Sequence, residues 1–466
     1  MKKIGKNNDN KIFFYWLPLF VIVIILIFLP FQAFLQTWLR FKFQLTSGQA
    51  FFISLWKEYL LLILLVIVVI KTFIRKKLPF KLLLLDKIIL GFFLLAFICF
   101  LLFGGTLGQK ILGLRYDLEF LVVYFLARSF NLKKSEIKTL LTLFLGAAIF
   151  SIIFGLLQIS LLPPSFLVSL GYSKNMDIYS QTGIIPTYDS IHPFLPNFYR
   201  IQSTFPGALQ FSSYLTLVMS ITFALTLFIK KKKKVFLGSL FFISLIALFA
   251  TYARSAWLGF LVSVFVMLFI YVRKKIYVIL PAAISVFLGL ILVISLFNVQ
   301  AFQTLILHGE VRDGGLFGST QAHQSAFTES IKLAIQNPLG IGVGAAGPAS
   351  KATVNVIIPE NWYLQIVLEL GIAGLVIFVS IIYFLFRKLL DIFKNSQDNF
   401  YKMLSLGLIG SLVGVSVSSL FLHTWADTPA VYSFWIFAGL VISSFESSSL
   451  KNNSPKSLQK SSKSLK

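Results

Sequence analysis

The sequence predicts an all-α polytopic integral membrane protein with about twelve transmembrane helices and one large extracytoplasmic loop. Hydrophobic residues make up 57% of the 466 residues and charged residues only 13%, which excludes an ordinary soluble domain. Runs of about 20 apolar residues recur along the whole chain, and each is long enough to cross a bilayer as a helix. One long polar stretch, residues 299–361, interrupts this pattern and carries histidines, arginine and several carboxylates. The catalytic or binding site is expected in this stretch.

The apolar runs define the predicted spans. A hydropathy window of about 19 residues places them near 12–31, 51–70, 82–103, 113–129, 139–162, 208–229, 235–251, 256–272, 276–298, 362–386, 402–422 and 429–445. The first run is too long for a cleaved signal peptide and lacks a small-residue cleavage site. The single cysteine, Cys99, lies inside an apolar run, so neither a disulfide framework nor a cysteine-based metal site is predicted.

Basic residues orient the predicted bundle. Lysine and arginine cluster at every second joint between spans and at both ends of the chain, near 2–11, 71–81, 128–138, 230–234, 273–275, 387–402 and 451–466. By the positive-inside rule, these joints and both termini face the cytoplasm. The net charge of +25 is therefore explained by topology, with attraction to anionic lipid as a by-product, and no nucleic-acid partner is needed.

This orientation places four segments outside: 32–50, 104–112, 163–207 and 299–361. Segment 163–207 is rich in proline, tyrosine and serine and is expected to form a capping loop. Residues 1–446 form the predicted membrane domain. The tail 447–466, rich in serine and lysine, is expected to be a disordered cytoplasmic extension.

The long outer loop contains one predicted helix and a glycine run. Residues 321–336 show weak helical periodicity, typical of an amphipathic helix at the interface, and Asn337-Pro338 ends it. The glycines that follow, Gly342 and Gly344 among them, permit positive φ and close approach of the backbone. They predict equally well a nest of N–H groups for an anion or a tight turn packed on the bundle.

Three arginines are candidates for binding an anion. Arg254 lies in the tight outer turn TYARSAW, where a cation near the membrane is costly without a partner. A fixed anion site is favoured over snorkelling to headgroups. Arg200 likewise precedes a span at the outer side, and Arg312 lies in the long loop, where a solvated charge is an equal alternative. Together they suit a pyrophosphate or other oxyanion, because guanidinium pairs with phosphate through two hydrogen bonds.

Glu360 is the candidate general base, since it stands where the long loop re-enters the membrane. Burial raises the pKa of such a carboxyl and a nearby arginine lowers it. The alternative is a negative charge that stabilises a helix start. His323 is either a second acid or base or a hydrogen-bonding loop residue.

Other charges are assigned to the bundle. Glu369, within the span that follows Glu360, is expected to be an internal partner rather than a catalyst. Arg115 is expected to pair with Asp117 or Glu119. The sequence has no HExxH motif, Cys/His cluster, Walker lysine or Ser-His-Asp signature, so no metal or cofactor is predicted.

Three stretches in the second half resemble the O-antigen ligase/polymerase-like membrane family: TYARSAWLGF, NPLGIGVGAAGPAS and ENWYLQIVLELGIAGLVIF. They follow the family's order, with its long outer loop before the last of them. The resemblance covers about 235–386, and RIQSTFPGALQFSSYL before it and LHTWADTPAVYSFWIFAGL after it add support. The first half resembles the family only in its pattern of spans.

The resemblance implies a GT-C-like glycosyltransferase of the cytoplasmic membrane that works at the outer face without a metal. Its donor would be an oligosaccharide on a polyprenyl-pyrophosphate carrier, and its acceptor a glycan, a lipid or a protein. Arg254 matches the arginine that the family uses on the donor pyrophosphate, and Arg312 lies about where a second loop arginine is expected. Where the best-known form has a histidine before the asparagine as its proposed base, this chain has Glu360.

The predicted mechanism is one direct displacement with inversion at the sugar carbon. Arg254, Arg200 and Arg312 would neutralise the pyrophosphate that leaves, and Glu360 would take the proton of the acceptor hydroxyl. The remaining candidates are expected to bind sugar, to fix the loop or to let the backbone approach the donor: Asn361, Tyr363, Gln365, Gly342 and Gly344. The alternatives are a transporter or flippase of lipid-linked glycan, which would have a site near the membrane midplane, and a purely structural membrane partner.

Overall fold

The computed structural model describes residues 3–173, 185–187, 199–230, 232–272, 311–312, 315–316, 319–352 and 356–452. Over these ranges the protein is almost entirely helical, and its strands are the two residues each of β1 (Val311–Arg312) and β2 (Gly315–Leu316), which pair antiparallel. The prediction of an all-α polytopic membrane protein is confirmed. Ten of the described helical segments are long and apolar enough to cross a membrane.

The helices follow the predicted spans closely. The long ones are α1 (Lys3–Phe28), α4 (Trp56–Arg75), α5 (Leu84–Leu102), α6 (Leu107–Arg128), α7 (Lys134–Ser160), α10 (Ala208–Phe228), α11 (Lys232–Ala250), α12 (Arg254–Val272), α16 (Trp362–Asn395), α17 (Asn399–Ser418) and α18 (Thr428–Asn452). The short ones are η1 (Leu29–Phe31), α2 (Gln32–Lys42), α3 (Ser47–Ser54), α8 (Pro164–Val168), α15 (Ser319–Gln336), η2 (Gly347–Ala352) and η3 (Thr424–Ala426).

Two features differ from the predicted spans, and one predicted span is not tested. Helix α6 is less apolar than the other spans, since it carries Lys110, Arg115, Asp117, Glu119 and Arg128, and it packs beside α18. Segment 32–50 is largely helical, as α2 and α3, rather than an open loop. The predicted span 276–298 lies outside the described residues.

The last helix extends into the tail 447–466, which was predicted to be disordered. Helix α18 continues to Asn452, because neither glycine nor proline interrupts the chain between Glu446 and that residue. Residues 453–466 lie outside the described residues. The prediction that 447–466 is disordered is therefore wrong for 447–452.

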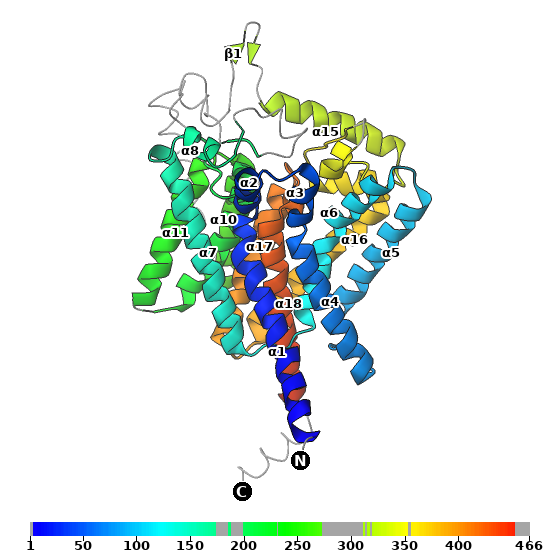
Figure 1. Ribbon diagram of the computed structural model, residues 1–466, viewed down its shortest axis with the longest axis vertical. Coiled ribbons are helices and arrows are strands. Elements are labelled where there is room, and N and C mark those ends of the chain that lie inside the picture. The colour runs from blue at the N-terminus through cyan, green and yellow to red at the C-terminus, as the bar shows by residue number, and fades with distance from the viewer. Residues whose placement is uncertain are drawn as a thin grey trace.

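The described parts of the four segments predicted outside lie at one end of the bundle, called here the loop end. Figure 1 shows α2, α3, α8 and α15 together at the top, whereas α1 begins and α18 ends at the bottom. The backbone N–H of Phe34 donates to Thr204 O at 3.3 Å, which joins segments 32–50 and 163–207. Gln109 Nε2 donates to Gly344 O at 3.0 Å, which joins 104–112 to the long loop. The prediction that these segments share one side is confirmed by these contacts.

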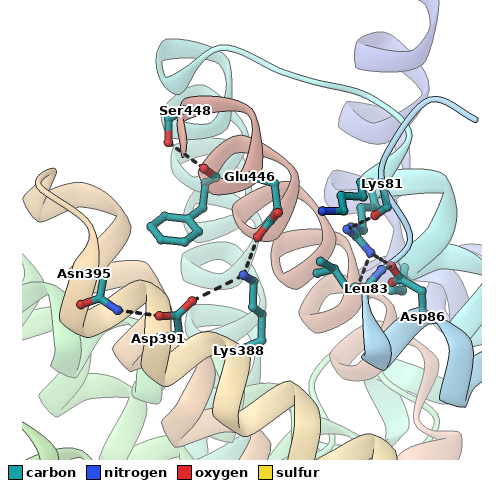
Figure 2. Close-up of polar contacts among 11 residues, drawn as sticks. Lys81, Leu83, Asp86, Lys388, Asp391, Asn395, Glu446 and Ser448 are labelled. Carbon is teal, nitrogen blue, oxygen red and sulfur yellow. Dashed lines mark hydrogen bonds and ion pairs between the residues drawn. The ribbon is translucent and has the colours of Figure 1, made fainter. Parts of the chain in front are cut away.

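The opposite end, called the lysine end, is held by buried or partly buried ion pairs. Arg128 and Asp86 form a salt bridge whose side chains are 1% and 0% exposed, and Arg128 Nη2 donates to Lys81 O at 2.9 Å. Lys388 bridges Asp391 and Glu446, so that α16 and α18 are tied together (Figure 2). These contacts fix the helices of the bundle to one another at the end away from the loops.

The core of the bundle is built from α10, α17 and α18, which are the most buried of its spans. Helices α12 and α17 approach closely at Gly259, where an added Cβ would come within 2.4 Å of Gly414 O and of Ser418 Oγ. Helix α16 is broken at Gly371, whose φ of +72° is readily adopted only by glycine. The N–H of Ile372, freed by this break, donates to Pro338 O and so fixes the long loop against α16.

Candidate functional site

A cavity of about 590 Å³ lies at the loop end, and Glu360 forms part of its wall. Its lining comes from α2, α4, α6, the start of α10, η2 and the segment between α17 and α18. The polar and charged residues of the lining are Gln32, Gln36, Ser54, Lys57, Arg115, Tyr116, Glu119, Thr204, Gln210, Lys351, Glu360, His423, Asp427, Thr428 and Tyr432. Helices distant in the sequence thus converge on one polar site.

The backbone holds Glu360 in an unusual conformation. Its φ is +52°, a region that non-glycine residues rarely occupy and that costs free energy unless the surroundings enforce it. The next residue enforces it: Asn361 caps α16, since its Oδ1 accepts from Leu364 N at 2.9 Å and its Nδ2 donates to Leu420 O at 2.8 Å. Asn361 is the N-cap and Glu360 precedes it, so Glu360 does not cap α16, and the alternative that its negative charge stabilises the helix start stays open.

One wall of the cavity carries a balanced group of charges, called here the charged wall. Lys57 Nζ lies 2.5 Å from Glu58 and 3.4 Å from Glu119, although Lys57 is only 1% exposed. Arg115 contacts the same two carboxylates, at 2.6 Å and 3.5 Å. Two cations face two anions, so the group has no net charge. The prediction that Arg115 pairs with a neighbouring carboxylate is confirmed for Glu119, whereas Asp117 lies elsewhere.

The segment between α17 and α18 contributes His423 and Asp427 to the same cavity. Neither ring nitrogen of His423 has a hydrogen-bond partner among the described residues, although both nitrogens are buried. Burial, with a smaller effect from the nearby charge of Lys351, lowers the pKa of His423 to about 4, so the imidazole is neutral at pH 7. Burial raises the pKa of Asp427 to about 7, and Ser213 Oγ donates to its carboxylate at 2.6 Å.

Arg200 and Arg254 lie together at the turn between α11 and α12. Arg200 Nε donates to Thr251 O at 3.1 Å, and the backbone of Ile201 donates to Ala250 O. Arg254 begins α12 directly after this turn. Ser418 Oγ donates to the carbonyl next to Arg254, that of Ser255, at 3.0 Å. The backbone N–H of Trp362 donates to Ser419 O, so the end of α17 contacts the starts of both α12 and α16. Neither arginine is among the lining residues of the Glu360 cavity.

The glycine run packs on the bundle. An added Cβ on Gly344 would come within 2.3 Å of Gln109 O, and one on Gly342 within 2.6 Å of the Phe103 side chain. Both glycines have positive φ and neither lines the cavity. Of the two interpretations open from the sequence, the packed turn is the one that these contacts explain.

Three residues proposed to hydrogen-bond sugar have partners within the protein. Asn361 caps α16, as described, and Tyr363 Oη donates to Ser416 O at 2.9 Å, which ties α16 to α17. Gln365 is fully buried and its Nε2 lies 3.4 Å from carboxylate oxygens of both Asp117 and Glu369. The contacts fit the alternative that these residues fix the loop. Glu369 is an internal partner, as predicted.

Two candidates lie where side chains are not described. His323 falls on α15, and the predicted helix and its end before Asn337 are both confirmed. Arg312 falls on β1 of the small hairpin. The side chains of both lie outside the described residues.

Sequence reasoning missed most of the lining residues, among them Gln36, Lys57, His423 and Asp427. Two signals were available. Lys57 interrupts an apolar run, where an ionisable residue marks a functional or paired position. LHTWADTP places a histidine and an aspartate in a short joint between two apolar spans. Gln36 has no comparable signal, because only the packing of α2 against other helices brings it to the cavity.

Comparison with known proteins gives two matches. The family model described as O-Antigen ligase matches residues 239–379, which falls within the region 235–386 that carries the motifs. An O-antigen polymerase of Salmonella muenchen is 28% identical over 223 residues. That alignment covers 47% of this chain and 52% of the relative, so the chain spans about half the length of the curated relative it matches.

Proposed function

We propose that this chain, an O-antigen ligase/polymerase-like membrane protein, is a glycosyltransferase of the cytoplasmic membrane. It would transfer a glycan from a polyprenyl-pyrophosphate carrier to the hydroxyl of a glycan, lipid or protein acceptor, without a metal. The observation that carries the proposal is the position of Glu360, a carboxylate held at positive φ on the wall of a polar cavity at the loop end. A group in a costly conformation at a cavity is typical of a reacting residue.

The reaction needs a base and a place for the leaving group. Glu360 takes the proton of the acceptor hydroxyl, whose oxygen then attacks the anomeric carbon. The bond from that carbon to the pyrophosphate oxygen breaks, and its electron pair stays with the carrier. Arg254 and Arg200, beside one turn at the same end, offset the negative charge of the leaving pyrophosphate. Arg312 remains a candidate for binding the pyrophosphate, and His323 remains a candidate for a second acid or base.

The orientation follows from charge. The lysine end carries the clusters that the positive-inside rule assigns to the cytoplasm, so both termini would be inside and the Glu360 cavity outside. The hydrocarbon chain of the carrier would stay in the lipid beside the bundle, whose outer surface presents many exposed apolar side chains. Only the pyrophosphate and the sugars would then need polar surroundings.

One observation favours the transporter alternative. Helix α16 is broken at Gly371, and the buried carboxyls of Asp117 and Glu369 lie near this break. Broken helices and intramembrane carboxylates are features of secondary transporters. The break is nevertheless occupied by the long loop, through the bond from Ile372 N to Pro338 O. A packed loop leaves no described passage at that point, which favours the transferase.

An assay of glycan transfer in vitro tests the proposed function. The purified full chain in lipid nanodiscs is incubated with a panel of polyprenyl-pyrophosphate-linked glycans and with glycan, lipid and protein acceptors. We expect a new glycosidic product with one donor class and no dependence on added divalent metal. Movement of lipid-linked glycan across proteoliposomes without any product would instead assign the chain to the flippase class.

A further inference from the structure

The Glu360 cavity contains buried polar groups that no described residue satisfies. They are Nε2 of Gln36, on α2, and both ring nitrogens of His423, between α17 and α18. A buried donor or acceptor left without a partner costs about 1–3 kcal/mol. Most other buried side-chain amides of this end are paired: Gln109 bonds Gly344, and Gln158 bonds Ser203. The unpartnered groups of the cavity therefore point to a ligand that supplies hydrogen bonds.

The charges of the cavity argue that this ligand is uncharged. Lys57 and Arg115 are compensated by Glu58 and Glu119 within the charged wall, so they leave no excess positive charge for a phosphate. Glu360 adds a negative charge that balances Lys351, the remaining cation of this lining, so the cavity offers no excess positive charge to a pyrophosphate. The arginines suited to the pyrophosphate lie at the α11–α12 turn instead. A ligand with many hydroxyls and no charge fits the cavity better.

The apolar part of the lining fits the same class. Aromatic side chains, among them Phe120, Phe205, Trp425 and Tyr432, line the cavity together with the polar groups. Ligand sites commonly combine apolar or aromatic walls with a few placed polar groups. A sugar ring matches this combination, since its C–H faces are apolar and its rim of hydroxyls both donates and accepts. Neutral imidazole, which donates from one nitrogen and accepts at the other, suits a hydroxyl.

The site continues along α2 and α3. A second cavity, of about 570 Å³, shares Gln36, Ser54 and Ile185 with the first. Amide and hydroxyl side chains lie along it, namely Thr37, Gln44 and Ser47. Arg40 Nη2 donates to Ser47 Oγ at 3.1 Å across the α2–α3 joint, and the Thr46–Gln49 capping box fixes the start of α3. The two cavities together form a path longer than one sugar ring.

We propose that the two joined cavities bind an extended, uncharged oligosaccharide, the acceptor end of the transfer, with Gln36 and His423 as its hydrogen-bonding residues. This proposal rests on the proposed function, and it selects a glycan over a lipid or protein acceptor. Glu360, on the wall shared with His423, takes the proton of the terminal hydroxyl. Gln36, at the junction of the cavities, binds the next sugar and so favours acceptors of more than one unit.

The test measures binding separately from transfer. The full chain in nanodiscs is titrated with uncharged oligosaccharides of one to six sugars, prepared from the surface polysaccharide of the producing cell, and with inorganic pyrophosphate. Binding is followed by calorimetry and by the fluorescence of tryptophan, because Trp425 lines the cavity. We expect affinity to rise from one sugar to several, with no competition by pyrophosphate. Competition, or affinity independent of length, would overturn the proposal.

The variants identify the residues. Gln36→Leu and His423→Phe should each weaken oligosaccharide binding by about tenfold, the loss of roughly one hydrogen bond in a buried site. In transfer they should raise the KM for acceptor and leave the KM for donor unchanged. Gln397→Leu, an exposed glutamine at the lysine end, is the matched control. His423→Gln keeps hydrogen-bonding groups and should retain part of the affinity for oligosaccharide. It replaces His423→Phe in the test if the Phe variant does not fold.

The outcomes separate the two proposals. If no donor supports transfer but oligosaccharide binding depends on Gln36 and His423, the proposed function fails and the sugar site stands. If transfer proceeds while Gln36→Leu and His423→Phe bind and react like the unchanged protein, the sugar site fails and the proposed function stands.

Discussion

Both ends of the bundle hold paired charges, but the polar groups that they leave unpaired have different surroundings. At the lysine end, Arg128 and Asp86 are buried against each other, and Lys388 bridges two acidic residues (Figure 2). At the loop end, Gln36 and His423 keep buried polar atoms without partners. Among the described non-glycine residues, positive φ occurs at Gln44, Ser203, Tyr252 and Glu360 at the loop end and at Lys76 at the other end. Paired charges hold the helices at both ends, and the loop end also leaves unpartnered polar atoms at a cavity wall.

The largest effect is expected at Arg254. Arg254→Ala should abolish transfer while leaving insertion in the membrane intact, because the leaving pyrophosphate loses a guanidinium at the loop end. Arg254→Lys should recover only part of the activity, since ammonium keeps the charge and loses the two-pronged fit to phosphate. Arg387→Ala, an exposed arginine at the lysine end, provides the control. Full transfer by both Arg254 variants would leave this arginine with a structural or headgroup contact only.

Glutamates at the two ends give a matched pair of substitutions. Glu360→Gln should lower turnover by about 10²–10⁴, the usual contribution of a positioned general base, with donor binding nearly unchanged. Glu446→Gln, which removes a partner of Lys388, should leave turnover within a few-fold. Glu360→His should restore part of the activity, with its pH dependence moved toward that of imidazole. Single-turnover assays measure these rates. A near-normal rate for Glu360→Gln would show that Glu360 is not the base, and His323 would be the next residue to test.

Stability is expected to depend on the lysine end. Arg128→Leu leaves Asp86 charged and buried without its partner and should destabilise the fold by about 3–5 kcal/mol. Transfer per folded molecule should stay unchanged, because the pair is remote from the cavity. Thermal unfolding in detergent and activity normalised to folded protein measure the two effects. The double variant Asp86→Leu/Arg128→Leu should regain much of the stability, and a stable Arg128→Leu would contradict the comparison.

Asp427 predicts a pH dependence of stability. Burial raises its pKa to about 7 from an ordinary value of 3.8, so the folded protein binds a proton that the unfolded chain has released between these values. Stability from this group is therefore full below about pH 4 and is lost as the pH rises to about 7. Melting temperatures at pH 5 and pH 8 should differ more for the unchanged protein than for Asp427→Asn. Equal differences would show that Asp427 does not titrate in this range.

The smallest effect is expected at the cap that holds Glu360. Asn361→Ala removes the helix N-cap and the bond to Leu420 and should cost about 1 kcal/mol of stability. Turnover should fall a few-fold, because Glu360 loses the neighbour that enforces its backbone conformation. Asn361→Asp keeps the cap and loses the amide donor. Its stability and its turnover should therefore lie between those of the unchanged protein and those of Asn361→Ala. A larger loss of turnover than in Glu360→Gln would assign Asn361 a direct role.

The helices were predictable because the bilayer imposes length and apolarity on each span, and every described span falls on a predicted run. The cavity was less predictable, since its wall combines α2, α4, α6, α10, η2, Glu360 and the α17–α18 segment. The sequence predicted that three charged residues lie at the loop end, because each stands directly beside an apolar span: Glu360, Arg200 and Arg254. Gln36 and His423 were missed, because a residue without a partner is recognised only when its neighbours in space are known. The sequence left open whether Gln365 and Gly344 bind substrate or fix the loop, and in the structure both are packed.

The last turn of α17 has a mechanical consequence. Ser418 holds the start of α12 beside Arg254, while Leu420 accepts from Asn361 beside Glu360. One short stretch of chain, Ser418 to Leu420, therefore contacts the starts of the two helices that carry the proposed leaving-group arginine and follow the proposed base. Inserting or deleting one residue in this stretch would shift one contact relative to the other, and with it the spacing that the proposed reaction needs.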